Sequence, residues 1–140
     1  MKELREFANW VKLKSEHKHL EDKDIIVTGD FNLETKPMFD ALYSKGLEIP
    51  SGLKKSEFGT NLAKDKRYDQ ILHLSRYPDS FMNKGGFLDF YTGGTEVLFP
   101  GMEKEAFTYQ LSDHLPLWVQ IDTDNDAYQL DQVIKARKDG

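Results

Sequence analysis

Two polar side chains follow a short apolar run near the first quarter of the chain. Asp30 and Asn32 come directly after residues 25–27, which are Ile, Ile and Val, and a Thr-Gly pair. Strand residues at i and i+2 point to the same side, so both side chains can project together from a strand end. Gly29 lets the backbone turn and approach a ligand closely. A carboxylate beside a neutral amide suits a hard cation such as Mg²⁺ and an oxygen-rich substrate. The same residues also suit a simple Asp-Phe-Asn turn.

A carboxylate and an imidazole stand next to each other in a second stretch, "LSDHLPLW", residues 111–118. Asp113 and His114 come just before a predicted strand, and Pro116 limits how the chain enters it. Neighbouring side chains diverge in a regular strand, so both reach one site only from a turn or bulge. Such a pair can bind metal and move protons near neutral pH. The alternative is that Asp113 caps a turn and His114 is a half-exposed polar residue.

A third acidic side chain, Asp69, lies within the alternating stretch "RYDQIL", residues 67–72. An acid on the apolar side of a sheet would be costly without a partner, and an imidazole N–H is the obvious candidate. A carboxylate in that place would hold the tautomer of a histidine. We therefore predict that Asp30, Asn32, Asp113 and His114 converge in one cleft, with Asp69 in hydrogen-bond reach of His114.

The elements that would position these residues follow from hydrophobic periodicity. The unbroken apolar run before Gly29 predicts a strand buried on both faces. Residues 78–105, which are rich in Gly, Asn, Asp and Pro, are predicted to be dominated by loops. The other predicted elements are a helix in residues 1–19, a helix from Pro37 to Lys45 that Gly46 stops, strands in residues 66–75 and 114–122, and an amphipathic helix in residues 125–138.

These elements predict an α+β fold in which a mixed, mostly antiparallel sheet is covered by helices. We expect a single domain over residues 1–140, with a helical tail over residues 123–140. A chain of 140 residues is long enough to bury a core. The net charge of −5 argues against unaided, non-specific nucleic-acid binding. The chain has no cysteine, no apolar run long enough for a membrane span and no signal-peptide pattern, which favours a cytoplasmic location.

Three stretches in this order resemble the C-terminal half of the endonuclease/exonuclease/phosphatase superfamily, which has the fold of pancreatic deoxyribonuclease. They are "GDFN" after an apolar strand, "RYDQIL" in the middle and "SDHLP" before the last strand. "GTNLAKDKRYD", residues 59–69, also resembles that family's approach to its middle strand. The likeness runs from about Asp24 to Asp122, and three ordered motifs are far more specific than one. It implies half of a four-layer α/β sandwich.

The resemblance also implies a chemistry, namely divalent-metal-dependent hydrolysis of a phosphoester, with Mg²⁺ or Mn²⁺ as the cofactor. By matching position, Asp30 would bind metal and activate the attacking water, and Asn32 would contact the scissile phosphate. Asp113 would bind or orient the metal, and His114 would serve a phosphoryl oxygen or a proton transfer. Asp69 would orient His114. Thr60 and Asn61 are weaker matches, to residues that contact substrate phosphate.

The superfamily fold is roughly twice this length, and its N-terminal half supplies the glutamate that is the principal metal ligand. These 140 residues begin at the helix that precedes "GDFN". We therefore expect a half-domain that binds metal weakly and is inactive alone, whatever its phosphoester substrate, nucleic acid included. Two alternatives stay open: a non-catalytic binding or assembly module that keeps the fold, and an unrelated α/β domain.

A half-sandwich would leave one face of its sheet uncovered, because its helices can cover only the other. An exposed apolar face of that size marks an interaction surface. We therefore expect a homodimer, or a complex with a separate N-terminal half, with the uncovered sheet face at the interface.

Overall fold

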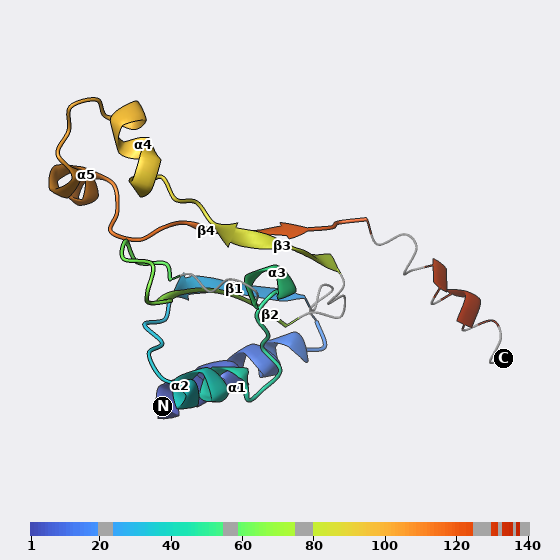
Figure 1. Cartoon of the computed structure of the whole chain (residues 1–140). Coiled ribbons are helices and arrows are strands. Elements are labelled where there is room, and N and C mark those ends of the chain that lie inside the picture. Colours follow the sequence, from blue (N-terminus) through green and yellow to red (C-terminus); the bar gives the residue numbers. More distant parts are fainter. Residues whose placement is uncertain are drawn as a thin grey trace.

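The structure is a computed structural model that describes residues 1–19, 24–54, 59–74 and 80–124, together with residues 130, 131, 133–135 and 137 of the tail. Helices and strands are mixed along the chain (Figure 1). In order they are α1 (Lys2–Ser15), β1 (Ile25–Asp30), α2 (Lys36–Tyr43), α3 (Ser51–Lys54), β2 (Asp69–Leu74), β3 (Phe81–Phe87), α4 (Tyr91–Leu98), α5 (Lys104–Gln110) and β4 (Leu117–Ile121).

The strands pair into two small antiparallel sheets, which confirms the predicted α+β class. β1 pairs with β2 in a register that joins Ile25 to Leu74 and Asp30 to Asp69. β3 pairs with β4, with an irregularity between Phe81 and Gly85. The single predicted sheet is wrong for the described strands. The other edge of β2 is occupied at His73, which exchanges both backbone hydrogen bonds with Glu48 at 2.8 and 2.9 Å, and among these strands β3 pairs only with β4.

Helices α1 and α2 cover one face of the β1–β2 sheet (Figure 1). The core between them contains Ala8, Val11, Leu33, Leu42, Leu47 and Leu72, all at most 3% exposed. Ile25 and Val27 pack against this core, whereas Ile26 between them is 49% exposed. The prediction that this strand is buried on both faces is therefore wrong, because the far side has only partial cover.

That partial cover comes from the β3–β4 sheet, which lies on the side of β1–β2 opposite α1 and α2 (Figure 1). The ring of His73 stacks on Phe81 of β3 with ring centroids 3.9 Å apart. The sequence predicted that this whole sheet face would be uncovered, but a second sheet covers part of it. The reason is that β3, which the sequence analysis did not predict, supplies a second layer.

The prediction that residues 78–105 are dominated by loops is also wrong. They contain β3 and α4, and α5 begins at Lys104. One of the glycines that suggested loops, Gly85, has a packing role in β3, and Gly52 of the facing helix α3 has another. A Cβ on Gly52 of α3 would lie 2.5 Å from the backbone carbon of Lys84 in β3. Glycine is therefore required there because α3 and β3 meet backbone to backbone.

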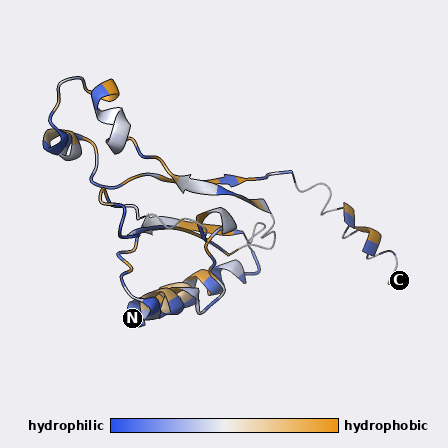
Figure 2. Ribbon diagram, in the orientation of Figure 1, coloured by the Kyte–Doolittle hydropathy of each residue, from blue (hydrophilic) through white to orange (hydrophobic). Residues whose placement is uncertain are grey.

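The described residues of the tail, 130, 131, 133–135 and 137, are helical, as predicted for residues 125–138. This short red helix lies apart from the rest of the described chain (Figure 1) and has hydrophobic residues beside hydrophilic ones (Figure 2). Leu130, Val133 and Ile134 are 60, 50 and 41% exposed. The remaining tail residues of that prediction lie outside the described part. None of the helices that the structure describes has both the length and the apolar character needed to cross a membrane.

The His73 ring should make the stability of the chain depend on pH. This ring is buried, its Nδ1 has no hydrogen-bond partner among the described residues, and burial lowers its pKa below the ordinary 6.5. Lys54 lowers the pKa further and Glu48 opposes it. The unfolded chain then binds a proton more readily, so the free energy of unfolding should fall as pH decreases below about 6.5. Urea unfolding between pH 7.5 and 5.5 should show a weaker pH dependence in His73→Phe than in the parent. An equal dependence in both would contradict this, and His17→Gln serves as the exposed control.

Candidate functional site

The predicted contact between Asp69 and His114 is present. Nδ1 of His114 lies 2.8 Å from Oδ2 of Asp69, and the two side chains are 27 and 26% exposed. Asp69 is the first residue of β2, and His114 lies in the turn before β4. A carboxylate only accepts hydrogen bonds, so Nδ1 carries the proton in this pair. The remaining ring nitrogen, Nε2, can therefore accept a proton or, when the ring is charged, donate one.

Thr60 holds the two halves of this pair in place. Its hydroxyl accepts hydrogen bonds from the backbone N–H groups of Tyr68 and Asp69, each at 3.1 Å. Its carbonyl accepts the N–H of Leu115 at 2.6 Å. Thr60 is fully buried, so its hydroxyl has no exposed surface for the substrate phosphate that the resemblance assigned to it. Its observed contacts fix the start of β2 against the residue that follows His114.

Asn61 uses its side-chain amide inside the turn that follows Thr60. Its Oδ1 accepts from the N–H groups of Asp65 and Lys66 at 3.1 and 2.9 Å, and its Nδ2 donates to Asp65 at 2.6 Å. Its backbone forms an isolated bridge with His114. Asn61 therefore lies close to the site but has its amide engaged within the chain.

Asp30 ends β1 directly opposite Asp69 on the paired strand. Like charges on facing residues repel, so a cation or an imidazolium nearby would stabilise this end of the sheet. The strand stops before Asn32, which has φ 47° and donates its backbone N–H to Oδ1 of Asp30 at 3.1 Å. The same-side rule for strands therefore does not place Asn32 beside Asp30. A turn does, and both side chains are exposed.

Asp113 is exposed and precedes His114 in a turn in which the N–H of His114 donates to Oγ of Ser112 at 2.9 Å. A turn is what the sequence required if both side chains are to serve one site. Among the residues that the structure describes, no group of three or more His, Asp or Glu side chains could hold a metal ion. Asp30 and Asp113 therefore do not form a complete metal site with other described residues.

Two residues next to the site were missed by the sequence analysis. The ring of Tyr68 stacks on that of His114, with centroids 5.9 Å apart and planes at 27°. Nζ of Lys66 lies 5.7 Å from the centroid of the Tyr68 ring, and its hydrogen bond with the Tyr68 side chain raises the pKa of Lys66. In the sequence, only their position just before Asp69 indicated that these two residues could lie near the site.

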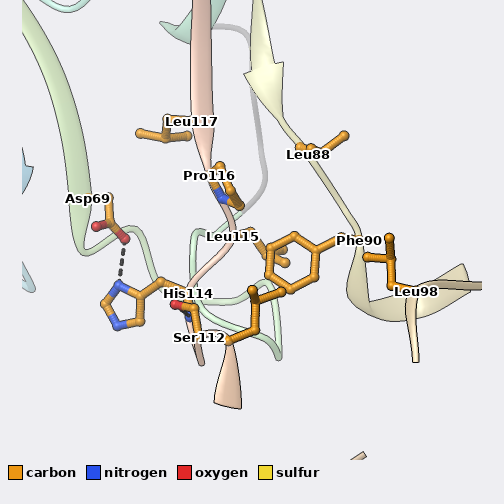
Figure 3. Close-up of a pocket in the computed structure, with 10 residues that line it drawn as sticks. Asp69, Leu88, Phe90, Leu98, Ser112, His114, Leu115, Pro116 and Leu117 are labelled. Atoms are coloured by element: carbon orange, nitrogen blue, oxygen red, sulfur yellow. Dashed lines mark hydrogen bonds and ion pairs between the residues drawn. The ribbon is translucent and has the colours of Figure 1, made fainter. Parts of the chain in front are cut away.

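A pocket of about 460 Å³ opens beside the Asp69–His114 pair. Figure 3 shows the pair on one side and Leu88, Phe90 and Leu98 on the other. The walls come from the end of β3, from α4 and from the approach to β4. The described residues that line it are Asp69, Leu88, Phe90, Leu98, Leu111, Ser112, His114, Leu115, Pro116 and Leu117. Most of this lining is apolar, and the acid–imidazole pair supplies its main polar groups.

Comparison with protein-family models, with curated proteins and with solved structures found no match. The chemistry that the site supports therefore follows from its own side chains.

Asp69→Asn should change the tautomer of His114. An asparagine amide can donate to Nδ1, which moves the ring proton to Nε2, whereas the aspartate keeps it on Nδ1. Nitrogen NMR of the ring should show mainly Nδ1–H in the parent and mainly Nε2–H in the variant at neutral pH. The free energy of unfolding should fall by about 1 kcal/mol, since the pair is partly exposed to water.

Asp40→Asn is the matched control for this prediction. Asp40 forms an exposed ion pair with Lys36 on α2, 2.8 Å long and remote in sequence from the site. Loss of this ion pair should lower the free energy of unfolding by about 0.5 kcal/mol or less and leave the His114 tautomer unchanged. An unchanged tautomer in Asp69→Asn would show that Asp69 does not orient the imidazole.

Proposed function

We propose that this chain is the C-terminal half-domain of a divalent-metal-dependent phosphoester hydrolase with a deoxyribonuclease-like sandwich fold. The observation that supports this most is the 2.8 Å contact between Asp69 and His114 at the wall of a pocket. The ordered motifs around Asp30, Asp69 and His114 point to the same chemistry.

The residues of this chain would act on a phosphoester in distinct ways. Asp69 orients the imidazole and stabilises its protonated form. Nε2 of His114 donates a hydrogen bond to a phosphoryl oxygen or a proton to the leaving oxygen. The carboxylate of Asp30 accepts a proton from the attacking water, and the Asn32 amide donates to the phosphate. Thr60 takes part through Asp69, whose backbone it holds.

The metal would neutralise charge that develops on the phosphate oxygens. Mg²⁺ or Mn²⁺ favours several oxygen ligands in near-octahedral geometry. The described residues include no group of three or more His, Asp or Glu side chains that could hold a metal, so Asp30 and Asp113 would not suffice. We therefore propose weak metal binding by the isolated chain, with the remaining ligands supplied by a separate N-terminal half.

A second candidate function is a non-catalytic binding or assembly module. The observation that favours it is exposed apolar side chains on the strands, where Ile26, Trp118 and Ile121 are 49, 47 and 39% exposed. A second copy of the chain or an N-terminal half would cover them. Light scattering that found only monomer at high concentration would count against this assembly.

Titration with inorganic phosphate tests the proposed hydrolase. Phosphate should shift the NMR signals of the His114 ring and of the Tyr68 ring stacked on it in the parent. The Tyr68 response should be lost in His114→Gln, and His17→Gln should respond like the parent. Mg²⁺ should bind with half-saturation on the order of 1 mM or weaker, because few protein ligands replace its water. No response of His114 to phosphate would overturn the proposal.

The isolated chain should also show no appreciable turnover of bis(4-nitrophenyl) phosphate with Mg²⁺ or Mn²⁺. The reason is that the described acidic side chains do not complete a metal site. Turnover that Asp30→Ala abolished would show that the chain is a complete enzyme and not a half-domain.

A further inference from the structure

The pocket beside His114 has the composition of a small-molecule site. Such sites are mostly apolar with a few placed polar groups, and their volumes run from about 300 to 1,000 Å³. This one measures about 460 Å³, and its polar side chains are Asp69, Ser112 and His114. The acid–imidazole pair therefore borders a space that fits an apolar group.

The apolar wall is partly exposed as it stands. Leu88, Leu98 and Leu111 are 60, 54 and 50% exposed, and all of them line the pocket. Covering apolar area removes it from water and stabilises the complex in proportion to that area. A ligand with an aryl or alkyl group would cover these side chains while its polar end stays near His114.

The wall is anchored to the turn that leads into the site. Oδ1 of Asp89 accepts the N–H of Thr92 at 2.9 Å near the start of α4. Lys64 donates to the carboxylate of Asp89 and to Oγ1 of Thr92. The hydrogen bond from Lys64 lowers the pKa of Asp89 to about 2, so this carboxylate is charged at neutral pH. α4 is thus tied to the turn that contains Lys64, which reduces the ordering needed when a ligand binds.

Phe90 is supported from behind by a small aromatic cluster. Its ring lies 5.8 Å from that of Phe107, which is fully buried, and Phe107 lies 5.3 Å from Phe99. Aromatic pairs at these separations pack favourably. The ring that faces the pocket therefore has a fixed position against which a flat ligand can stack.

The charges around the pocket disfavour a polyanion. No lysine or arginine is among the described residues that line it, and the whole chain carries a net charge of −5. Nucleic-acid binding depends on many cationic contacts to phosphates. The site offers hydrogen bonds to one phosphate group through His114. It also offers an apolar surface for the organic group esterified to that phosphate.

We propose that the substrate is a phosphate ester of an apolar alcohol, with its aryl or alkyl group in the pocket and its phosphate at His114. The proposal rests on the proposed hydrolase function, because it assigns the phosphate to His114. The apolar group lies against Leu88, Phe90 and Leu98, and the phosphate lies at the side of the pocket that His114 lines.

The test uses binding of 1-naphthyl phosphate to the full chain, followed by NMR of the leucine methyl groups and the His114 ring. Inorganic phosphate, 1-naphthol and a thymidine tetranucleotide are the comparison ligands. Naphthyl phosphate should bind at least about tenfold more tightly than inorganic phosphate, because its ring buries apolar area. It should shift both Leu98 and His114, and the tetranucleotide should bind no more tightly than inorganic phosphate.

Leu98→Gln and Val97→Gln form a matched pair for this test. Both residues lie on α4, where Leu98 lines the pocket and Val97 is 78% exposed outside it. Leu98→Gln should lose the tenfold preference for naphthyl phosphate, and Val97→Gln should keep it. Both side chains are exposed, so circular dichroism should show that both variants remain folded.

The outcomes separate this inference from the function on which it rests. If phosphate shifts the His114 signals but naphthyl phosphate binds no more tightly than inorganic phosphate, the proposed substrate class is overturned and the hydrolase proposal stands. Binding of naphthol at Leu98 with no phosphate response at His114 overturns both proposals. Tighter binding of the tetranucleotide overturns the substrate class in favour of nucleic acid. If the Leu98 signals are lost as the chain concentration rises, a second copy of the chain occupies the pocket. This result also overturns the proposed substrate class.

Discussion

Gly59→Ala is expected to destabilise the chain by about 3 kcal/mol or more, because overpacking against backbone has no cheap relief. A Cβ at this position would overlap the backbone nitrogen of Lys66 and lie 2.6 Å from its backbone oxygen. The N–H of Gly59 also donates to the carbonyl of Lys64 at 2.9 Å. The added methyl group would push apart the two arms of the turn that positions Thr60 and, through it, Asp69.

Gly93→Ala is the control for this substitution. Nothing lies within 4 Å of a Cβ at Gly93, which is in the interior of α4. Alanine there should raise the free energy of unfolding by up to about 1 kcal/mol, through helix propensity and the unfolded chain. Urea unfolding of both variants measures the difference. If Gly59→Ala were as stable as the parent, the close approach between residues 59 and 66 would not exist in solution.

Thr60→Val is expected to lower the free energy of unfolding by about 2 to 4 kcal/mol, since it leaves two backbone N–H groups without their acceptor. Valine keeps the branched shape of threonine, so the change removes the hydroxyl and little else. The N–H groups that lose their acceptor are those of Tyr68 and Asp69, at the start of β2. The Nδ1–H signal of His114 should weaken with them, because the position of Asp69 is no longer fixed.

Thr60→Ser separates the hydroxyl from the methyl group. Serine can restore both hydrogen bonds and should recover the His114 signal, at a cost of about 1 kcal/mol for the missing methyl group in a fully buried site. Urea unfolding and ring NMR at the same pH measure both effects. Equal losses in Thr60→Ser and Thr60→Val would mean that Thr60 acts by packing alone.

Local periodicity determined much of this fold. The helical spacing of apolar residues within residues 1–19, namely Leu4, Phe7, Trp10 or Val11, and Leu13, predicted α1, although Trp10 and Leu13 are 56 and 58% exposed. Pro37 with Gly46 bounded α2 within one or two residues. The strands β1, β2 and β4 also lie where apolar runs and alternation predicted them. These features succeed because helix and strand periods are set by neighbours in the chain.

The Asp69–His114 contact was also accessible from the sequence. Asp69 alternates onto the side of β2 that faces away from the helical core, where an acid on an apolar face favours a donor. His114 stands at the entry of another strand and supplies that donor at 2.8 Å. Residue types, alternation and the order of the motifs were enough to pair two residues 45 positions apart.

Only the tertiary structure decided how separated backbone segments meet. Glycines in the region of β3 read as loop residues, yet a Cβ on Gly85 would lie 3.1 Å from the Leu53 side chain of α3. Thr60 read as a phosphate ligand, yet it is buried among the N–H groups of its neighbours. The apolar wall of the pocket, with Leu88 and Leu98, lies in the same misread region. Close approach and burial depend on which distant segments pack together, and no local period in the sequence carries that information.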